Sequence, residues 1–462
     1  MMADAAKTKR LVVVSNRVGP LKDTGKAGGL AVALVDMLRE RGGVWFGWSG
    51  QVTDAGTFSE LHRERSKTVD LATIDIDPAD NAEFYAGYAN RTLWPVLHYR
   101  LDIAEFSPAF EAGYRRVNER FAARLLPLLR AEDQIWVHDY HFFHLGAELR
   151  RMGVENRIGF FLHIPFPPPD MLSALPRHRD LVRSLLAYDV IGLQTDRDRR
   201  HFIDYLKEEA NGVDLGGHRV RAFDREVTVA AFPIGIDTEG FHGFAEGPEA
   251  KRERTRLERH LNGRRQIVGV DRIDYSKGIP HRFRAVERFF EEYPEHRGKV
   301  SLLQVAPPSR SEVDAYMDIR RELEHLAGHV NGRFADVDWT PIRFITRGFP
   351  RRALAGVYRA SRLALVTPLR DGMNLVAKEY VAAQDHEDPG VLLLSRFAGA
   401  AETMGEALIV NPYAADEVAL AIKSAFDMPL DERRARHDAL YARLVEGDAR
   451  NWANAFLRLL DG

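Results

Sequence analysis

The sequence contains no cysteine, which excludes disulfides, thiolate zinc sites and cysteine nucleophiles. It has no apolar run long enough to span a membrane, and residues 1–10 lack the apolar core of a signal peptide. It also lacks the G-x-G-x-x-G pattern, so a nicotinamide cofactor is not indicated. These absences predict a cytoplasmic protein, and we expect it to need no cofactor.

An excess of positive charge is missing as well. Lysine and arginine number 65 against 67 aspartate and glutamate residues, which gives a net charge of −2. This balance argues against nucleic acid or a membrane surface as a partner. The 462 residues are 45% hydrophobic and 29% charged, which is ordinary for a globular protein of two or three domains.

Short aliphatic runs recur along the whole chain, separated by segments long enough for helices. These runs, which we read as buried strands, are 11–15, 134–137, 158–162, 190–194, 227–231, 266–270, 300–305, 342–345, 363–366 and 391–395. Strands that alternate with helices predict a parallel α/β fold. Two halves of about 200 residues suit two doubly wound, Rossmann-like domains that face a cleft. The Pro/Gly segment 233–237 marks their boundary.

The stretch 370–379, RDGMNLVAKE, follows one of these strands. Pro368 and Gly372 indicate a turn, and Asn374 can cap a helix that begins at Leu375. A helix that starts after a tight loop presents free backbone N–H groups and a positive dipole end, which suit a polar or anionic ligand. Glu379 lies about 7.5 Å further along this helix on its inward face, where an acid needs a partner.

Arg272 and Lys277 share another loop, after the strand 266–270. Two cations there could hold a diphosphate, although a solvated basic loop would look the same. Gly28 and Gly29 precede a helix and would allow a phosphate to approach the backbone, but paired glycines are more often only a turn.

A metal site is not favoured. His138, His141 and His144 recur at spacings of three, but no carboxylate or thiol set completes a zinc site, and Asp139 between them is expected to reach a crevice. The acidic pairs Asp75/Asp77 and Asp336/Asp338 are similar to those of metal-using transferases, yet we expect both to be surface turns.

Several motifs together carry a resemblance to a known family. They are VVVSNR (12–17), AGGLAV (27–32), WFGWSG (45–50), LWPVLHYRLD (93–102), WVHDYH (136–141), RIGFFLHIPFP (157–167), DRIDYSKGI (271–279), QVAPPSR (304–310), TPLRDGMNLVAKEYVAAQ (367–384) and LSRFAGAAE (394–402). In this order they closely resemble the trehalose-6-phosphate synthases, retaining glycosyltransferases of the GT-B fold. The resemblance implies transfer of glucose from a nucleotide diphosphate glucose, first of all UDP-glucose, to glucose 6-phosphate.

The resemblance also implies residue roles on the donor side. The catalytic residues would be Arg272, Lys277, His163 and Asp371. The residues expected to bind the donor are Gly28, Gly29, Arg272, Lys277, Phe349, Asp371, Gly372, Met373, Asn374, Leu375, Val376, Ala377, Lys378 and Glu379. Of these, Glu379 would hold the ribose, and His163, Asp371 and the backbone of 372–374 would hold the sugar.

On the acceptor side the resemblance implies a phosphate site made by Arg17, Tyr85 and Arg310. Asp139 would bind sugar hydroxyls, and Trp94 would lie over the acceptor. The implied domains are an acceptor domain over 1–235, a donor domain over 236–440, and a helical segment over 441–462 that packs back on the first domain. Relatives form dimers and tetramers, so a homo-oligomer is expected.

Two other functions remain open. The same fold could glucosylate another phosphorylated acceptor, such as glycerol 3-phosphate. A catalytically silent nucleotide-sugar-binding regulator is the alternative of another class, although Arg272, Lys277, Asp371 and Glu379 are all present.

Overall fold

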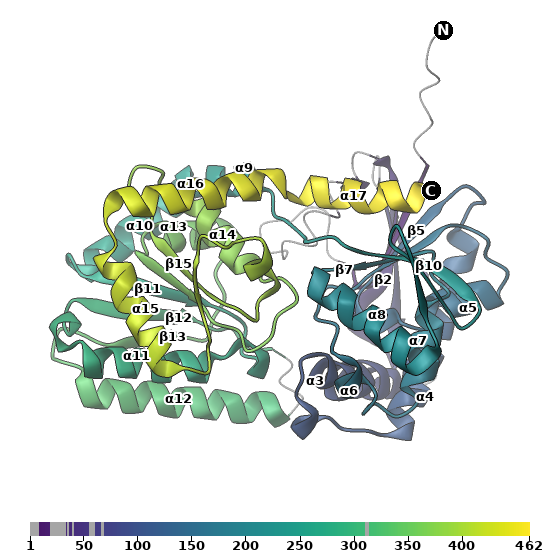
Figure 1. Ribbon diagram of the computed structural model, residues 1–462, viewed down its shortest axis with the longest axis horizontal. Coiled ribbons are helices and arrows are strands. Elements are labelled where there is room, and N and C mark those ends of the chain that lie inside the picture. Colours follow the sequence, from purple (N-terminus) through teal and green to yellow (C-terminus); the bar gives the residue numbers. More distant parts are fainter. Residues whose placement is uncertain are drawn as a thin grey trace, which may run out of the picture. The chain divides into compact units, whose positions relative to one another are not determined.

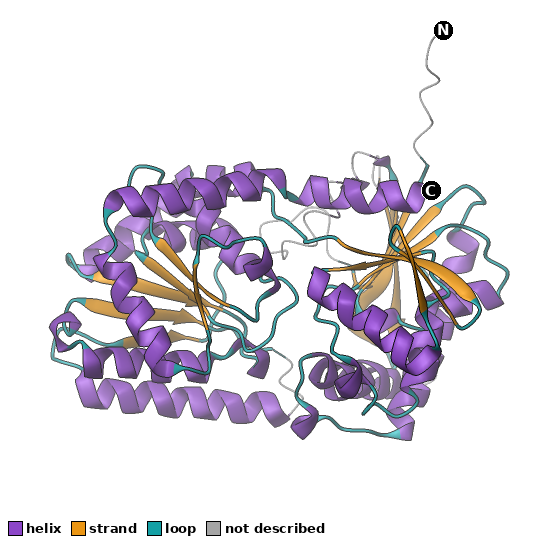
Figure 2. Ribbon diagram, in the orientation of Figure 1, coloured by secondary structure: helices purple, strands orange, loops and turns teal. Residues whose placement is uncertain are grey.

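The computed structural model describes residues 9–18, 34, 37, 38, 41–54, 61–65, 69–309 and 314–462. The chain divides into two compact units: unit 1 comprises residues 1–232 and 452–462, and unit 2 comprises residues 233–451. The division falls at the start of the Pro/Gly segment 233–237, and residues 441–451 belong to unit 2. Each unit contains one β-sheet flanked by helices (Figures 1 and 2).

The sheet of unit 1 has the order β3-β4-β2-β1-β5-β6-β7-β10-β9-β8. Its strands are β1 (Leu11–Arg17), β2 (Gly43–Val52), β3 (His62–Arg65), β4 (Val69–Ile76), β5 (Gln134–His138), β6 (Ile158–Phe161), β7 (Val190–Leu193), β8 (Val213–Gly216), β9 (Arg219–Ala222) and β10 (Arg225–Ala231). From β4 to β10 the neighbours are parallel. At the edges β3, β8 and β9 pair in antiparallel fashion, so the expected parallel sheet is mixed there.

The longer helices of unit 1 follow the expected alternation with strands. The helices are α2 (Pro78–Asp80), η1 (Asn81–Leu93), α3 (Trp94–Leu97), η2 (Leu101–Ile103), α4 (Pro108–Leu125), η3 (Leu126–Leu128), η4 (Tyr140–Phe142), α5 (Leu145–Arg151), α6 (Pro169–Leu172), α7 (His178–Leu185), α8 (Asp196–Ala210) and α17 (Ala449–Asp461). The segment η1 is a π-helix of 13 residues, a form that proteins rarely extend beyond one turn. Nothing in the apolar pattern predicted it.

Helix α17 covers β6 and β7 of unit 1 through its residues from 452 onward. Phe456 stacks on Trp136 at 4.5 Å between ring centroids. A Cβ atom at Gly159 would lie 2.6 Å from the Phe456 ring, so glycine is required for this close packing. Leu460 is fully buried, whereas Leu459 is only half-buried.

The sheet of unit 2 has the order β13-β12-β11-β14-β15-β16 and is parallel throughout. Its strands are β11 (Arg265–Val270), β12 (Val300–Val305), β13 (Ile342–Ile345), β14 (Leu363–Val366), β15 (Val391–Ser395) and β16 (Leu408–Val410). The central strands are buried along their lengths, as expected for a sheet covered on both faces.

Two layers of helices cover this sheet. The helices are α9 (Thr238–Glu246), α10 (Pro248–Leu261), η5 (Tyr275–Lys277), α11 (Ile279–Glu292), η6 (Pro294–His296), α12 (Asp314–Phe334), α13 (Arg351–Arg359), α14 (Leu375–Ala383), η7 (Gly399–Glu402), α15 (Ala415–Asp427) and α16 (Leu430–Glu446). In Figure 1, α11 and α12 lie below the sheet and α10 and α13 above it. The core below the sheet is built on Phe283, Phe289 and Phe290 of α11 and on Val330 of α12.

Across the described residues, no helix combines the length and the apolar character that a membrane span requires.

Candidate active site

The two loops of unit 2 that the sequence singled out follow neighbouring strands. β11 and β14 lie side by side, with Ile267 paired to Leu363. From β11 the chain proceeds outward to β12 and β13, and it then returns to β14 on the other side of β11. The connections that leave β11 and β14 therefore run to opposite sides of the sheet. The loops after these two strands lie at this topological switch point, where open α/β sheets bind their ligands.

An ion pair joins these loops. The Lys277 Nζ lies 2.6 Å from the Asp371 Oδ2, and the side-chain amide of Asn374 donates to the same oxygen at 3.0 Å. The Lys277 and Asp371 side chains are only 13% and 14% exposed. The structure thus brings together a cation and an acid that are 94 residues apart in the sequence.

Gly278 allows the two loops to pack this closely. It has a φ of +64°, and a Cβ atom there would lie 2.4 Å from the carbonyl oxygen of Thr367. The backbone N–H of Leu369 donates to the carbonyl of Ser276 at 2.8 Å, which fastens the β14 loop to the β11 loop. Any larger residue at 278 would push the loops apart.

Asn374 caps α14 as the sequence predicted. Its side-chain oxygen accepts from the backbone N–H of Ala377 at 3.1 Å. Its φ is 83°, so this cap is left-handed rather than extended, which asparagine tolerates better than most residues. Met373 is buried, while Leu375 and Val376 are half-buried at the start of the helix. The first turn of α14 therefore offers backbone N–H groups beside partly accessible apolar side chains.

Glu379 is buried on the inward face of α14, and its partner is Arg351. The Arg351 Nη2 lies 3.0 Å from the Glu379 Oε1. Burial raises the pKa of Glu379, and the guanidinium opposes that rise. Lys378 faces elsewhere, because its Nζ donates to the carbonyl of Ile234 at 2.6 Å. Burial lowers the pKa of Lys378 to about 8.

Arg272 is the more exposed of the two expected phosphate ligands. Its Nε lies 3.4 Å from the Asp274 Oδ2, and its side chain is 38% exposed. Asp274 is fully buried and accepts from the backbone N–H of Ser276 at 3.0 Å and from the Tyr316 hydroxyl at 3.3 Å. This carboxylate therefore orders the loop while it orients the guanidinium.

Sequence reasoning missed the buried arginine, Arg282, that supports this loop from below. Arg282 of α11 donates to Asp271 at 2.7 Å, to the Thr367 hydroxyl at 3.0 Å and to Gln304 at 2.8 Å. It thus ties the ends of β11, β12 and β14 together. Its position was readable, because Ile279, Arg282, Val286 and Phe290 recur at helical spacing and place an arginine on an apolar stripe.

In unit 1 the switch point lies at β1, which is flanked by β2 and β5. Arg17 ends β1, and its guanidinium carbon lies 4.5 Å from the ring centroid of Trp48 and 5.4 Å from that of Tyr85. Two of the three expected phosphate ligands, Arg17 and Tyr85, are therefore brought together. Tyr85 reaches this point from the π-helix η1.

Asp139 follows β5 in a strained conformation. Its φ of 78° and ψ of 167° lie in a region that is almost restricted to glycine and costs about 1–3 kcal/mol. Its N–H donates to the carbonyl of Phe161 at 2.8 Å, and its Oδ1 accepts from the backbone N–H of His163 at 3.3 Å. Such strain is concentrated at functional sites. Here it occurs at Asp139, which lies beside His163, and both are predicted to bind sugar hydroxyls.

The histidines at this edge do not converge on one point. The His138 Nδ1 and the His163 Nε2 lie 3.0 Å apart, and the His144 Nδ1 is 2.8 Å from the Ser184 hydroxyl. Burial lowers the pKa of His163 to about 3, and it lowers the pKa of His138 well below its usual value. Both rings are therefore neutral near pH 7 and share a single hydrogen bond.

The sequence profile of glycosyltransferase family 20 matches residues 7–461. The chain belongs to glycosyltransferase family 20. It is 49% identical over 97% of its length to a trehalose-6-phosphate synthase of Sinorhizobium fredii, of which 97% is covered. It is 48% identical, with a TM-score of 0.95, to the Burkholderia xenovorans α,α-trehalose-phosphate synthase (UDP-forming) in complex with glucose-6-phosphate, over 98% of this chain and 100% of that one. An E. coli structure bound with UDP-2-fluoro glucose is 44% identical, with a TM-score of 0.94, over 98% and 99% of the two chains.

The family and the GT-B fold expected from the sequence are thereby confirmed. The residue roles stay predictions, and three of the residues, Gly28, Gly29 and Arg310, lie outside the described part of the chain. Phe349 is half-buried, with the Arg347 guanidinium 5.4 Å from its ring centroid. Trp94 is only 4% exposed and stacks on His98 at 4.1 Å, so its ring offers a ligand little surface.

The acidic pairs differ in part from expectation. Asp75 lies within the buried strand β4 and accepts from the Ser49 hydroxyl at 2.5 Å, so it is not in a surface turn. Asp77 caps α2 by accepting from the N–H of Asp80 at 2.7 Å. Asp338 is exposed and pairs with Arg264. These carboxylates have structural partners in this member of family 20.

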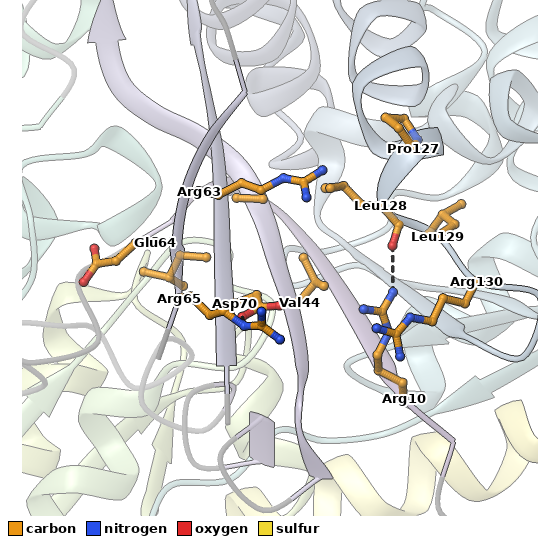
Figure 3. A pocket seen from close by; sticks show the side chains of 12 residues that line it. Arg10, Val44, Arg63, Glu64, Arg65, Asp70, Pro127, Leu128, Leu129 and Arg130 are labelled. Atoms are coloured by element: carbon orange, nitrogen blue, oxygen red, sulfur yellow. Dashed lines mark hydrogen bonds and ion pairs between the residues drawn. The ribbon is translucent and has the colours of Figure 1, made fainter. Parts of the chain in front are cut away.

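Unit 1 also has a pocket of about 390 Å³ at the opposite edge of its sheet, where β1, β2 and β4 begin. Figure 3 shows the side chains of Arg10, Arg63, Arg65 and Arg130 around it, with Arg10 donating to the carbonyl of Leu128 at 2.7 Å. None of the predicted site residues lines this pocket. It is therefore distinct from the carboxyl edge at which family 20 chemistry is expected.

Proposed function

We propose that the protein transfers glucose from UDP-glucose to glucose 6-phosphate, with retention at the donor anomeric carbon, to give α,α-trehalose 6-phosphate. The observation that carries the proposal is the joined pair of loops after β11 and β14. It places Lys277, Asp371 and the start of α14 together at the switch point of unit 2. The similarity to synthases whose structures contain glucose 6-phosphate or UDP-2-fluoro glucose supplies the substrate classes.

Departure of the nucleoside diphosphate leaves negative charge on the phosphate, and this charge must be stabilised as it develops. Lys277, Arg272 and the backbone N–H groups at the start of α14 are the groups expected to do so. An ammonium group has three donors, so Lys277 can keep its bond to Asp371 and still donate to a phosphate oxygen. The ion pair thus positions the cation before the substrate arrives.

The transfer then proceeds on one face of the sugar. The departing phosphate oxygen takes the proton of the acceptor hydroxyl while the bond from the anomeric carbon to the acceptor oxygen forms. His163 serves as a hydrogen-bond partner of the donor sugar rather than as a general acid, because burial keeps its imidazole neutral near pH 7. Asp371 stays paired to Lys277 and orients a sugar hydroxyl.

One experiment tests the function as a whole. A panel of donors (UDP-, GDP- and ADP-glucose) is combined with a panel of acceptors (glucose 6-phosphate, glucose and glycerol 3-phosphate), and the products are identified. We expect trehalose 6-phosphate to dominate and glucose to be a very poor acceptor. A glucosylglycerol phosphate product would reassign the acceptor, and the absence of turnover with every pair would favour a regulator.

Three further features remain proposals. We expect no cofactor, a dimer or tetramer in solution, and a cytoplasmic location. Size-exclusion chromatography with light scattering measures the oligomeric state. Fractionation of the native host locates the protein.

A further inference from the structure

Three metal-ligating side chains meet in unit 2, at the opposite end of α14 from the donor loop. His386 lies in the loop after α14, and His437 and Asp438 are neighbours on α16. One ligand atom from each residue lies within 4.8 Å of the other two. The Nδ1 atoms of His386 and His437 are each 3.7 Å from the Asp438 Oδ1. No predicted site residue belongs to this group.

His437 is held in the state that a metal ion requires. Its Nε2 lies 3.1 Å from the backbone carbonyl of Val381, and a carbonyl only accepts, so the Nε2 carries the proton. The Nδ1 therefore has a lone pair. A ring whose far nitrogen donates to a backbone carbonyl is the usual arrangement of metal-bound histidine.

That lone pair lacks a partner. The His437 side chain is only 3% exposed, and no described residue forms a hydrogen bond with its Nδ1. The carboxylate of Asp438 is near it, but 3.7 Å is too long for a hydrogen bond. A buried polar atom without a partner destabilises the folded state, and a bound cation would remove that cost.

The spacing suits a small cation. Two ligands on one tetrahedral zinc ion, each about 2.0–2.1 Å from it, lie roughly 3.3 Å apart. The separations of 3.7 Å are close to this value. The remaining adjustment falls on His386, which is exposed and lies in a loop, so its ring can turn toward the ion.

A further histidine adjoins the group. The ring centroid of His242 lies 5.3 Å from that of His386. The Nδ1 of His242 is 3.1 Å from the carbonyl of Ala382, and its Nε2 is 3.9 Å from the Glu246 Oε1. These contacts hold the His242 ring in place, so a water molecule is the expected fourth ligand.

We propose that His386, His437 and Asp438 bind one divalent transition-metal ion of the zinc class. Imidazole nitrogens favour zinc, nickel or copper over magnesium or calcium, which prefer oxygen ligands. Asn374 and Ala382 are separated by about 12 Å along α14, so the ion lies away from the reacting atoms. Its role is to fasten the end of α14 to α16, not to take part in glucosyl transfer.

The test uses the full-length protein after chelator treatment and dialysis. Isothermal titration calorimetry with zinc chloride should show one strong site per chain, and zinc should raise Tm. His386→Ala should lower the zinc affinity about tenfold or more and remove most of the Tm shift, because it removes a ligand from the exposed side of the group. Asp438→Asn keeps the size of the side chain and should weaken binding in the same way.

The matched control is the histidine pair on α12. His325 and His329 are one turn apart, with ring centroids 6.5 Å from each other, and His329 contacts Glu287. The double variant His325→Ala/His329→Ala should keep the strong site. Loss of the strong site in this control but not in His386→Ala would overturn the proposal, as would the absence of zinc binding to the wild type. Cobalt substitution adds a spectroscopic check, since the visible absorption of a four-coordinate ion should disappear in His386→Ala.

Discussion

The carboxyl edges of the two sheets hold their cations in different ways. In unit 2 the cations meet carboxylates, as in the pairs Lys277–Asp371 and Arg351–Glu379. In unit 1 Arg17 lies over the rings of Trp48 and Tyr85. An aromatic face attracts a cation without bringing a negative charge.

The difference matches the ligands expected at each edge. A carboxylate that fixes Lys277 can also bind a sugar hydroxyl, and one that pairs with Arg351 can also bind a ribose. A phosphate monoester carries nearly two negative charges, so a carboxylate beside Arg17 would repel it. Among the described residues, rings rather than a carboxylate position Arg17, which leaves its charge available to the phosphate.

The largest expected effect comes from breaking the pair in unit 2. Lys277→Ala and Arg272→Ala should each lower kcat by about 10²-fold, or roughly 3 kcal/mol, because each removes a charge placed where the leaving group becomes negative. Steady-state kinetics with saturating donor measure this. The control is Lys423→Ala, which breaks an exposed Lys–Asp pair of the same kind with Asp427. Equal kcat in all three folded variants would remove these residues from the reaction.

The corresponding change in unit 1 should act on the acceptor. Arg17→Lys keeps the charge but loses the planar fork that matches phosphate oxygens, so KM for glucose 6-phosphate should rise about tenfold. Arg310→Ala should raise the same KM and leave the donor KM nearly unchanged. Titration of each substrate in turn checks this, with Arg63→Lys in the remote pocket as the control. A selective rise in donor KM would contradict the assignment.

The strain at Asp139 offers a finer contrast within unit 1. Both Asp139→Gly and Asp139→Ala remove the carboxylate and should lower turnover. Only glycine adopts the φ of 78° readily, so the glycine variant should be more stable than the alanine variant by about 1–3 kcal/mol. Urea unfolding midpoints measure the difference. Equal stabilities would mean that the backbone relaxes and that the strain is not imposed by the fold.

The sequence predicted more of the site in unit 2 than in unit 1, for a physical reason. The donor loop is a local motif: one strand, one turn and one capped helix within about 20 residues, and each has its own residue signal. Asn374 and the inward-facing Glu379 were therefore placed correctly. The partner of Glu379, Arg351, was missed because it comes from another helix, and sequence spacing says nothing about contacts between helices.

In unit 1 the sequence predicted the strand ends but not the geometry around them. Strand ends predicted that Arg17 and Asp139 lie at the carboxyl edge, but the arrangement of Tyr85 depends on η1, whose π-helical geometry has no residue signature. The mixed edges of the sheet were also missed, because the short antiparallel strands lack an apolar run: β3 and β8 are largely exposed, and β9 buries only Val220 and Ala222. The alternation of strands and helices gave the α/β class correctly in both units.

We expect low pH to destabilise unit 1 more than unit 2. Burial lowers the pKa of His144 and His163 to about 3 from an ordinary 6.5, so the unfolded chain binds protons that folded unit 1 does not. Each histidine should therefore lower the free energy of unfolding by about 1.4 kcal/mol per pH unit below 6.5, until its folded pKa is reached. In unit 2 burial also lowers the pKa of His296 and His437, but it raises the pKa of Asp271 and Glu379, which acts in the opposite direction.

Tryptophan fluorescence can follow this difference, since Trp45, Trp48, Trp94, Trp136 and Trp452 belong to unit 1 and only Trp339 to unit 2. Between about pH 7 and about pH 5, the urea midpoint seen by fluorescence should fall more than the midpoint seen by circular dichroism. His144→Gln should reduce the slope. Coincident midpoints at every pH would show that the units unfold together.

The smallest expected effect is that of a chelator on catalysis: we expect kcat to stay unchanged. Every positive charge that the proposed reaction needs comes from the chain: Lys277, Arg272 and the first turn of α14. Asp371, the acid that pairs with Lys277, also accepts from Asn374 through the same Oδ2. A divalent ion there would have to displace an ammonium group 2.6 Å from that oxygen.

The test measures Tm and kcat on the same samples with and without EDTA. EDTA should lower Tm by removing the ion at His386, His437 and Asp438, while kcat stays unchanged. If kcat is lost instead and returns with magnesium or manganese, the diphosphate is held by a metal ion, and the contrast between charge pairs in unit 2 and aromatic rings in unit 1 no longer describes the chemistry.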